Sequence, residues 1–324
     1  MTNSIHRNTI RLFFGIAILC CSMNVFCQTK TTTEITENDR LSDTIVKKTE
    51  VWPKTIQVPE GFFMKELVYS RPDGYDLTLS YISKSENVKP RPAILFIHGG
   101  GWKEGNKAQF YRQGLYLAET YNIFPVFISY RLSDVAIFPA ALIDCKTAVR
   151  WIRSVADQYK IDTSRIAVCG GSAGAHLASL TALTSGVEKY ESGPYSEYSS
   201  SVSLAILFNG HYDMADQLKK HIQDNSMYLF FGGHPWEVPS VYGEASPILW
   251  VNKKTPPMLF LHGDKDHYPH EQSIEMAERL KYYGIDAEVE IYKDKEHAWF
   301  NKEPDCMITA KRMAEFIVKH FNIH

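Results

Sequence analysis

The sequence predicts an α/β fold in which an eight-stranded, mostly parallel sheet carries helices on both faces. Six apolar runs alternate with stretches of helical periodicity, and they are Ala93–Ile97, Ile123–Ser129, Ile166–Cys169, Ala205–Phe208, Met258–Leu261 and Ala287–Tyr292. Runs without polar alternation are typical of strands buried on both faces. Two further runs, Phe62–Tyr69 and Leu77–Ser83, flank the turn sequence RPDG, which predicts an antiparallel hairpin at the start of the sheet.

The stretches between the strands carry apolar residues three and four positions apart, as a helix with one buried face requires. The clearest sets are Leu142, Cys145, Val149, Ile152, Ala156 and Tyr159, and then Ala310, Met313, Ile317 and His320. Two stretches, Gly186–Ser201 and Met214–Asn252, break the alternation. We expect them to form small cap segments over the carboxyl edge of the sheet, where ligands bind in folds of this class.

Residues 1–27 have the pattern of a secretory signal peptide. Arg7 and Arg11 precede the apolar run Leu12–Cys21, which is too short to span a bilayer, and a cleavage site follows Cys27. An uncleaved anchor is the alternative. We therefore expect an exported protein, periplasmic or extracellular, with no stable membrane insertion once the signal is removed.

The rest of the chain divides into a linker, residues 28–55, and a folded domain, residues 56–324. The linker is rich in Thr, Lys, Glu and Asp and has no apolar period, which predicts a flexible tether. The whole sequence has a net charge of −2, and loss of two arginines with the signal leaves 33 − 37 = −4. This balance gives no sign of a nucleic-acid-binding surface.

Cysteine usage argues against a disulfide framework. The chain has six cysteines, and cleavage after Cys27 leaves three of them, Cys145, Cys169 and Cys306. Cys169 lies within an apolar strand and is expected to be a small core residue. Whether Cys145 and Cys306 pair in an oxidising compartment is left open by the sequence.

The candidate nucleophile is Ser172, in the sequence GGSAG between a predicted strand and a predicted helix. A strand, G-x-S-x-G and helix in this order place the serine on a strained turn, which needs small residues two positions before and after it. The N–H groups at the start of the following helix favour negative charge that develops nearby. A glycine-rich turn without chemistry is the alternative.

A serine nucleophile needs a base and a group that orients the base. In this arrangement the acid and the histidine follow later strands, in the order Ser, Asp, His. Asp266, in HGDKDH, and His297, in KDKEHAWF, stand at those places. Asp264 is the rival acid, because it lies closer to the end of its strand.

Three glycines follow the strand Ala93–Ile97 in the sequence HGGGW, His98–Trp102. Bare backbone N–H groups are what a tetrahedral oxyanion needs, and side chains would block its approach. We predict an oxyanion hole made by Gly99, Gly100 and Ala173, with Gly101 as a reserve donor. His98 is expected to support the loop through hydrogen bonds.

A nucleotide site and a metal site are the two alternatives for these segments. The glycine-rich stretches fit neither G-x-G-x-x-G nor the Lys-Ser/Thr ending of a P-loop, which argues against a nucleotide site. A metal site would draw on the cluster His262, Asp264, Asp266, His267 and His270. No helical H-x-x-x-H pair accompanies this cluster, so we predict neither a metal nor an organic cofactor.

Several motifs together resemble one family. They are HGGGW, SYRLSDVAIFPAALIDCKTAVRWIR, IDTSRIAVCGGSAGAHLA, HGDKD and EHAWF. As a set they resemble secreted carbohydrate esterases of the α/β-hydrolase superfamily, of the acetylxylan and feruloyl types related to the hormone-sensitive-lipase-like group. The resemblance covers Phe62 to the C-terminus and implies an α/β-hydrolase catalytic domain.

The resemblance implies Ser172 as nucleophile, Asp266 as acid and His297 as base. Two departures are visible in the sequence. Gly171 stands where lipase-like relatives have Asp, and Asp266-His267-Tyr268-Pro269 is one residue shorter than the usual D-x-x-V-P.

These features predict a serine esterase that removes acyl groups, acetyl foremost, from a carbohydrate, with feruloyl esters as the runner-up. A peptidase or amidase with the same triad and a sugar-binding module with an inactive triad are the rival classes. Seven aromatic residues near strand ends are candidates for stacking on sugar or feruloyl rings, although most are expected to be core residues. They are Trp102, Tyr130, Phe138, Trp236, Tyr242, Tyr268 and Trp299.

Overall fold

The computed structural model describes residues 56–86, 89–215 and 225–323. The predicted signal peptide, 1–27, and linker, 28–55, lie outside the described residues and stay predictions. Within the described ranges, no helix is both long enough and apolar enough to cross a membrane.

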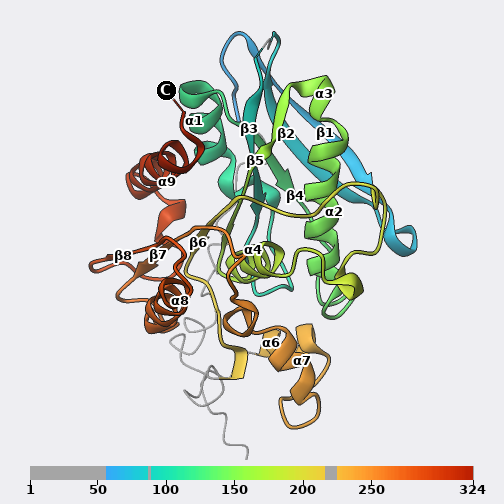
Figure 1. The fold of residues 1–324 in the computed structure, drawn as a ribbon, viewed down its shortest axis with the longest axis vertical. Coiled ribbons are helices and arrows are strands. Elements are labelled where there is room, and N and C mark those ends of the chain that lie inside the picture. Colours follow the sequence, from blue (N-terminus) through green and yellow to red (C-terminus); the bar gives the residue numbers. More distant parts are fainter. Residues whose placement is uncertain (1–55, 87–88, 216–224, 324) are drawn as a thin grey trace, which may run out of the picture. The chain divides into compact units, whose positions relative to one another are not determined.

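All eight predicted strands are present in one sheet (Figure 1). They are β1 (Phe62–Ser70), β2 (Leu77–Lys84), β3 (Arg91–Ile97), β4 (Phe124–Ile128), β5 (Ile161–Gly171), β6 (Leu204–Phe208), β7 (Met258–Gly263) and β8 (Ala287–Tyr292). Their spatial order is β1-β2-β4-β3-β5-β6-β7-β8. Strand β2 runs antiparallel to β1 and β4, and every other neighbouring pair is parallel. The predicted fold class is therefore confirmed.

Helices cover both faces of the sheet. They are α1 (Tyr111–Tyr121), α2 (Ala140–Ser154), α3 (Ala156–Tyr159), α4 (Ala173–Leu183), α6 (Asn225–Phe231), α7 (Pro239–Glu244), α8 (Glu271–Tyr282) and α9 (Asp305–Phe321). Helices α1 and α9 share one apolar core with one face of the sheet, and α2, α4 and α8 share a second core with the other face. The predicted helical run from Leu142 to Tyr159 is divided into α2 and α3 at Val155, where φ is −103° and ψ is 10°.

The two stretches that break the strand–helix alternation differ in structure. Residues 186–201 contain one short 3-10 helix, Glu188–Tyr190, and otherwise irregular backbone. The described part of the second stretch holds α6, α7 and the 3-10 helix Pro247–Trp250. The ring of Phe230 in α6 stacks on Trp102, just after the end of β3, with 4.8 Å between centroids. This contact places α6 beside the carboxyl edge of the sheet, as predicted for a cap segment (Figure 1).

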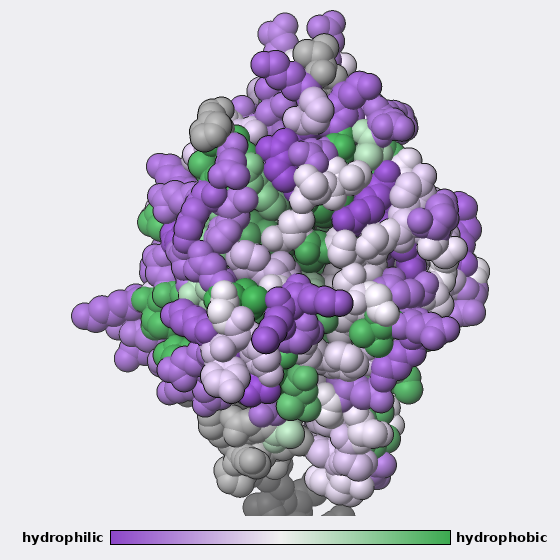
Figure 2. All heavy atoms as spheres, viewed as in Figure 1, coloured by the Kyte–Doolittle hydropathy of each residue, from purple (hydrophilic) through white to green (hydrophobic). Residues whose placement is uncertain are grey.

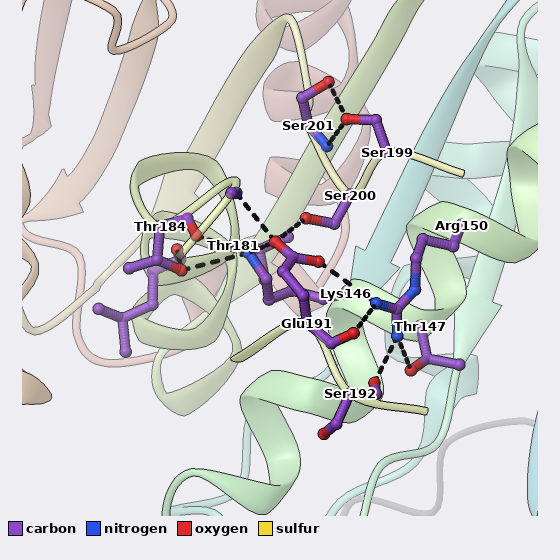
Figure 3. A network of polar contacts seen from close by, with 12 residues as sticks. Lys146, Thr147, Arg150, Thr181, Thr184, Glu191, Ser192, Ser199, Ser200 and Ser201 are labelled. Carbon is purple, nitrogen blue, oxygen red and sulfur yellow. Dashed lines mark hydrogen bonds and ion pairs between the residues drawn. The ribbon is translucent and has the colours of Figure 1, made fainter. Parts of the chain in front are cut away.

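The segment 186–201 is anchored to α2 by a buried ionic network (Figure 3). The Glu191 carboxylate lies 2.9 Å from Lys146 Nζ and 3.3 Å from Arg150 Nη1. Both cationic side chains are at most 1% exposed. Arg150 also donates hydrogen bonds to the carbonyl oxygens of Glu191 and Ser192 at 2.8 and 2.6 Å. Two buried cations on α2 therefore depend on one carboxylate from the segment.

Three cysteines lie in the described residues, Cys145, Cys169 and Cys306, and all three are buried and free. Cys145 and Cys306 do not pair. Cys169 is a core residue of β5, as the sequence predicts.

The Glu191 network predicts a stability defect. Glu191→Gln leaves Lys146 and Arg150 buried without a counter-charge, so we expect the free energy of unfolding in urea to fall by about 2–3 kcal/mol. Glu188→Gln, an exposed residue of the same segment, is the matched control and should unfold like the wild type.

The pH dependence of that defect follows from the pKa of Glu191. Burial raises this pKa, but hydrogen bonds from Ser200 and Lys146 outweigh burial and hold it below its ordinary value. A lowered pKa in the folded state gives stability that is complete at neutral pH and is lost as the pH falls through it. The difference between wild type and Glu191→Gln should shrink in acid, and a constant difference would contradict this assignment.

Candidate active site

Ser172 lies on a tight turn between β5 and α4, with φ 55° and ψ −122°. A positive φ is strained for a residue with a side chain, and the surrounding backbone must hold it. A Cβ on Gly170 would lie 2.1 Å from the carbonyl oxygen of Gly174, and a Cβ on Gly174 would lie 2.1 Å from that of Ile97. Both flanking glycines of G-x-S-x-G are therefore required by close backbone packing.

The structure brings Ser172, His297 and Asp266 together in one line of hydrogen bonds. His297 Nε2 lies 2.9 Å from Ser172 Oγ, and His297 Nδ1 lies 2.8 and 3.0 Å from the two carboxylate oxygens of Asp266. With a proton on Nδ1, the imidazole donates to Asp266 and can accept the serine proton at Nε2. Asp264 makes no contact with His297 in the described chain, so Asp266 is the residue that geometry provides as the acid.

Asp266 is a fully buried carboxylate that is well supplied with hydrogen bonds. Its side chain is 0% exposed, and it accepts from the Tyr268 backbone N–H at 2.9 Å and from Asn209 Nδ2. Burial alone would raise its pKa, but contacts with His262 and His297 dominate and hold the pKa well below the ordinary value. The carboxylate is therefore ionised throughout the neutral range and can stabilise an imidazolium on His297.

Asn209 was not singled out by the sequence analysis. It follows β6 directly and has φ 48°, a left-handed conformation that Asn tolerates better than most residues. A polar residue at the carboxyl end of a parallel strand, next to a glycine, is the signal that could have identified it.

The predicted oxyanion donors come from the HGGGW loop and from the start of α4. A Cβ on Gly99 would lie 2.6 Å from the Gly171 carbonyl oxygen, which shows how closely the HGGGW loop approaches the nucleophile turn. Ala173 is the first residue of α4, and its N–H has no carbonyl partner within the helix. Among the described residues, no hydrogen-bond acceptor is assigned to the N–H of Gly100 or Ala173.

Gly99 differs from the other two predicted donors. Its N–H already donates to Gln109 Oε1 at 2.7 Å, so this hydrogen must be shared or released before it can reach an oxyanion. Gln109, from the 3-10 helix Lys107–Phe110, is thus a supporting residue that the sequence analysis did not identify. Gly101, the reserve donor, lies against Ser226 at the start of α6.

His98 supports the HGGGW loop from inside. It is buried, its Nδ1 lies 2.8 Å from the Gly99 carbonyl oxygen, and its ring stacks on Tyr130 at 4.4 Å. Burial lowers its pKa to about 4, so the imidazole is neutral and its Nδ1–H can donate to that carbonyl.

His176 connects the nucleophile helix to the HGGGW loop and to the cap. Trp102 Nε1 donates to His176 Nδ1 at 3.2 Å, and His176 Nε2–H donates to the Ala245 carbonyl oxygen at 2.7 Å. Nδ1 can accept from Trp102 only in the neutral imidazole, and burial lowers the pKa of His176 to about 4. His176 was not predicted; its place one turn after Ser172 on α4 was the available signal.

The five residues of the alternative metal cluster do not come together as one group. In the described residues, one group of three side chains near the triad has ligand atoms that all lie within 4.8 Å of one another, and it consists of Asp266, His267 and His297. Only Asp266 and His267 of this group belong to the cluster considered from the sequence. Asp266 and His297 are already hydrogen-bonded to each other, so a metal ion there would compete with the triad.

Six of the seven aromatic residues proposed for stacking are buried. Trp102, Tyr130, Phe138, Tyr242, Tyr268 and Trp299 are each at most 8% exposed. Trp236 is 74% exposed and is the exception.

Together these groups can perform acyl transfer. They provide a serine hydroxyl, a histidine that can remove its proton, a carboxylate that orients the histidine, and backbone donors beside the reacting carbon. We find that each partner of the hydrogen-bonded line comes from a different strand end.

Comparison with known proteins gives a consistent result. The model of the BD-FAE family matches residues 79–280 of this chain. Esterase LipC of Mycobacterium tuberculosis is 31% identical over 202 residues, which are 61% of this chain and 50% of that protein. Isoprenylcysteine alpha-carbonyl methylesterase ICME of Arabidopsis thaliana is 24% identical over 265 residues, 76% of this chain and 60% of that protein. The chain spans about half the length of LipC and of two further curated esterases of Mycobacterium tuberculosis, LipQ and LipM.

Solved structures of an esterase from Thermogutta terrifontis, a Planctomycetes species, are also similar. With butyrate bound, that esterase has a TM-score of 0.68 and 28% identity, covering 80% of this chain and 94% of that chain. Phosphonylated by sarin, it has a TM-score of 0.69 and 28% identity, covering 81% and 96%.

The two candidate acids can be separated by mutation. Asp266→Asn removes the charge that orients His297 and should lower kcat by roughly 10⁴-fold, whereas Asp264→Asn should leave kcat within a factor of about three. Hydrolysis of 4-nitrophenyl acetate measures both, with urea unfolding as the control for stability. Equal losses of kcat in the two variants would contradict the assignment of Asp266 as the acid.

Proposed function

The chain belongs to the BD-FAE family of α/β-hydrolase esterases, and we propose that it removes short acyl groups, acetyl foremost, from carbohydrate hydroxyls. The observation that carries this proposal is the line of hydrogen bonds from Ser172 through His297 to Asp266, beside the N–H groups of Gly100 and Ala173. A carboxylic ester hydrolase needs this arrangement and no cofactor.

The reaction follows from the geometry in two halves. His297 Nε2 takes the proton of Ser172 as Oγ attacks the ester carbonyl, and the backbone N–H groups bind the oxyanion that forms. The imidazolium, stabilised by Asp266, then gives its proton to the alkoxy oxygen of the ester as the bond from that oxygen to the carbonyl carbon breaks, which releases the sugar with a free hydroxyl and leaves Ser172 acylated. Water hydrolyses the acyl-serine by the same route. This step releases the acid product and regenerates the hydroxyl of Ser172.

The surroundings of the triad support a short acyl group. The ring of Tyr268 lies 5.2 Å from that of His297 and 4.1 Å from that of His211. His211 lies 5.9 Å from Trp102, and the side chains of Tyr268, His211 and Trp102 are each at most 8% exposed. Bulky groups therefore crowd the space beside the reacting atoms, which favours acetyl over feruloyl. Solved structures of the Thermogutta esterase, a similar protein, hold propionate and butyrate, which are short acyl acids.

We further propose that the protein acts outside the cytoplasm, on an acylated glycan. Arg7 and Arg11 before a ten-residue apolar run support this proposal. The N-terminal residue of the protein recovered from the periplasm or the medium should be Gln28. Recovery of the intact chain with the membrane would favour an uncleaved anchor.

Acetate release tests the proposed reaction. Wild-type protein should release acetate from acetylated xylan and should hydrolyse 4-nitrophenyl acetate faster than methyl ferulate or aminoacyl 4-nitroanilides. Ser172→Ala lacks the nucleophile, and we expect its rate to fall by at least about 10³-fold on every ester.

The substrate panel separates the rival functions. Activity on aryl acetate without acetate release from any acetylated glycan would keep the triad and overturn the carbohydrate substrate. Preference for anilides would indicate an amidase. Full activity of Ser172→Ala would overturn the mechanism.

A further inference from the structure

Trp236 presents a large apolar ring to solvent. Of the other tryptophans in the described chain, Trp102, Trp151 and Trp299 are buried and Trp250 is half-buried, whereas Trp236 is 74% exposed. Its ring lies parallel to that of His234, with an interplanar angle of 5° and 4.5 Å between centroids. His234 therefore covers one face of the indole, and the rest of the ring is exposed to solvent.

The ring is held in place by a braced loop, residues 232–238. His234 packs on Tyr228 of α6 at 4.0 Å, and its carbonyl oxygen accepts from the N–H groups of Glu237 and Val238 at 2.9 Å. The His234 N–H donates to Glu237 Oε2 at 2.7 Å. Tyr242 Oη of α7 donates to the Gly233 carbonyl oxygen at 3.2 Å. An exposed ring on such a loop loses little further freedom when a ligand binds.

The same helix that supports this loop borders the candidate active site. Phe230 stacks on Trp102, and Ser226 lies against Gly101 of the oxyanion loop. Tyr228, between them on α6, begins the row of rings that leads outward through His234 to Trp236. The exposed ring is thus connected through α6 to the residues that border the active site. Figure 2 shows a mostly pale surface over α6 and α7, with other pale and green patches on the same face.

We propose that Trp236, supported by His234, is a distal platform that binds a pyranose ring of the glycan whose ester is held at Ser172. This inference rests on the proposed carbohydrate substrate and adds a binding site to it. The apolar C–H face of a pyranose is flat and matches one indole face, and the electron-rich face of an aromatic ring attracts such weakly positive hydrogens.

The position of the platform determines which substrates use it. A short aryl ester occupies only the surroundings of Ser172, whereas a chain of several sugars can reach Trp236 as well. The platform should therefore matter for oligosaccharides and polymers and should lower KM for them more than it changes kcat.

Binding is measured with the Ser172→Ala protein, so that no reaction intervenes. Unsubstituted xylohexaose, cellohexaose and mannohexaose are titrated by calorimetry into Ser172→Ala and into the same protein carrying Trp236→Ala, Trp236→Phe or His234→Ala. Tyr282→Ala, which removes another exposed aromatic ring, 81% exposed at the end of α8, is the matched control. Urea unfolding verifies that each variant is folded.

We expect at least one hexasaccharide to bind, and Trp236→Ala to weaken its affinity by about tenfold or more, as loss of a stacked aromatic anchor does. Trp236→Phe and His234→Ala should give smaller losses, and Tyr282→Ala none. In the protein with Ser172 present, Trp236→Ala should reduce kcat/KM for acetylated xylohexaose relative to kcat/KM for 4-nitrophenyl acetate, mainly through KM.

Three results would overturn the platform. They are no binding of any hexasaccharide, equal affinity of Trp236→Ala and its parent, and a dimer in solution that Trp236→Ala dissociates without a change in glycan affinity. The last result would assign the ring to contact with a second copy of the chain.

This test is separate from that of the proposed function. Acetate release by the wild type with no effect of Trp236→Ala would reject the platform alone. Glycan binding that depends on Trp236, without acetate release from any glycan, would reject the proposed reaction alone.

Discussion

The site depends on the close approach of backbones at the ends of β3 and β5. Gly99 lies against the Gly171 carbonyl, and Gly174 lies against the Ile97 carbonyl, so closely that a Cβ at either position would collide. This contact places the oxyanion donors and the serine within reach of one carbonyl carbon. The positive φ of Ser172 is held by a 2.7 Å hydrogen bond from its N–H to the Phe208 carbonyl oxygen. The strain needed for nucleophile exposure is thus sustained by the middle of the sheet.

Asp266 illustrates how a charge is kept inside the protein. A buried carboxylate is costly unless it is hydrogen-bonded and paired. Here Asn209, from the end of β6, and the Tyr268 backbone donate to it, and His297 comes from the loop after β8. The parallel order β6-β7-β8 brings these three loops to the same edge of the sheet. Sheet topology therefore makes the ionised acid possible.

The two stretches that the sequence predicts as cap segments are attached by different forces. Residues 186–201 are held against α2 by a buried ionic network around the Glu191 carboxylate. An apolar side chain at this position could not replace that negative charge. Helix α6 is attached through aromatic rings around Trp102, and His176 links that tryptophan to α4 and to Ala245. The oxyanion loop, the nucleophile helix and the second cap segment consequently share one packed cluster.

The sequence by itself determined the eight strands, the class of the sheet, and Ser172 and His297 as candidates, because buried strands need apolar runs and a strained turn needs glycines at known spacing. The sequence favoured Asp266 over Asp264 as the acid but could not exclude Asp264. The two residues are two positions apart in one loop, and the conformation of that loop determines which carboxylate reaches the imidazole. Asn209, Gln109 and His176 depend on contacts with segments 57, 10 and 69 positions away. The exposure of Trp236 among buried aromatic residues was likewise decided by tertiary packing. Strands and tight turns depend on residues that are close in the sequence, so local patterns predict them. Burial and long-range hydrogen bonds form only when the strand ends come together in the folded protein.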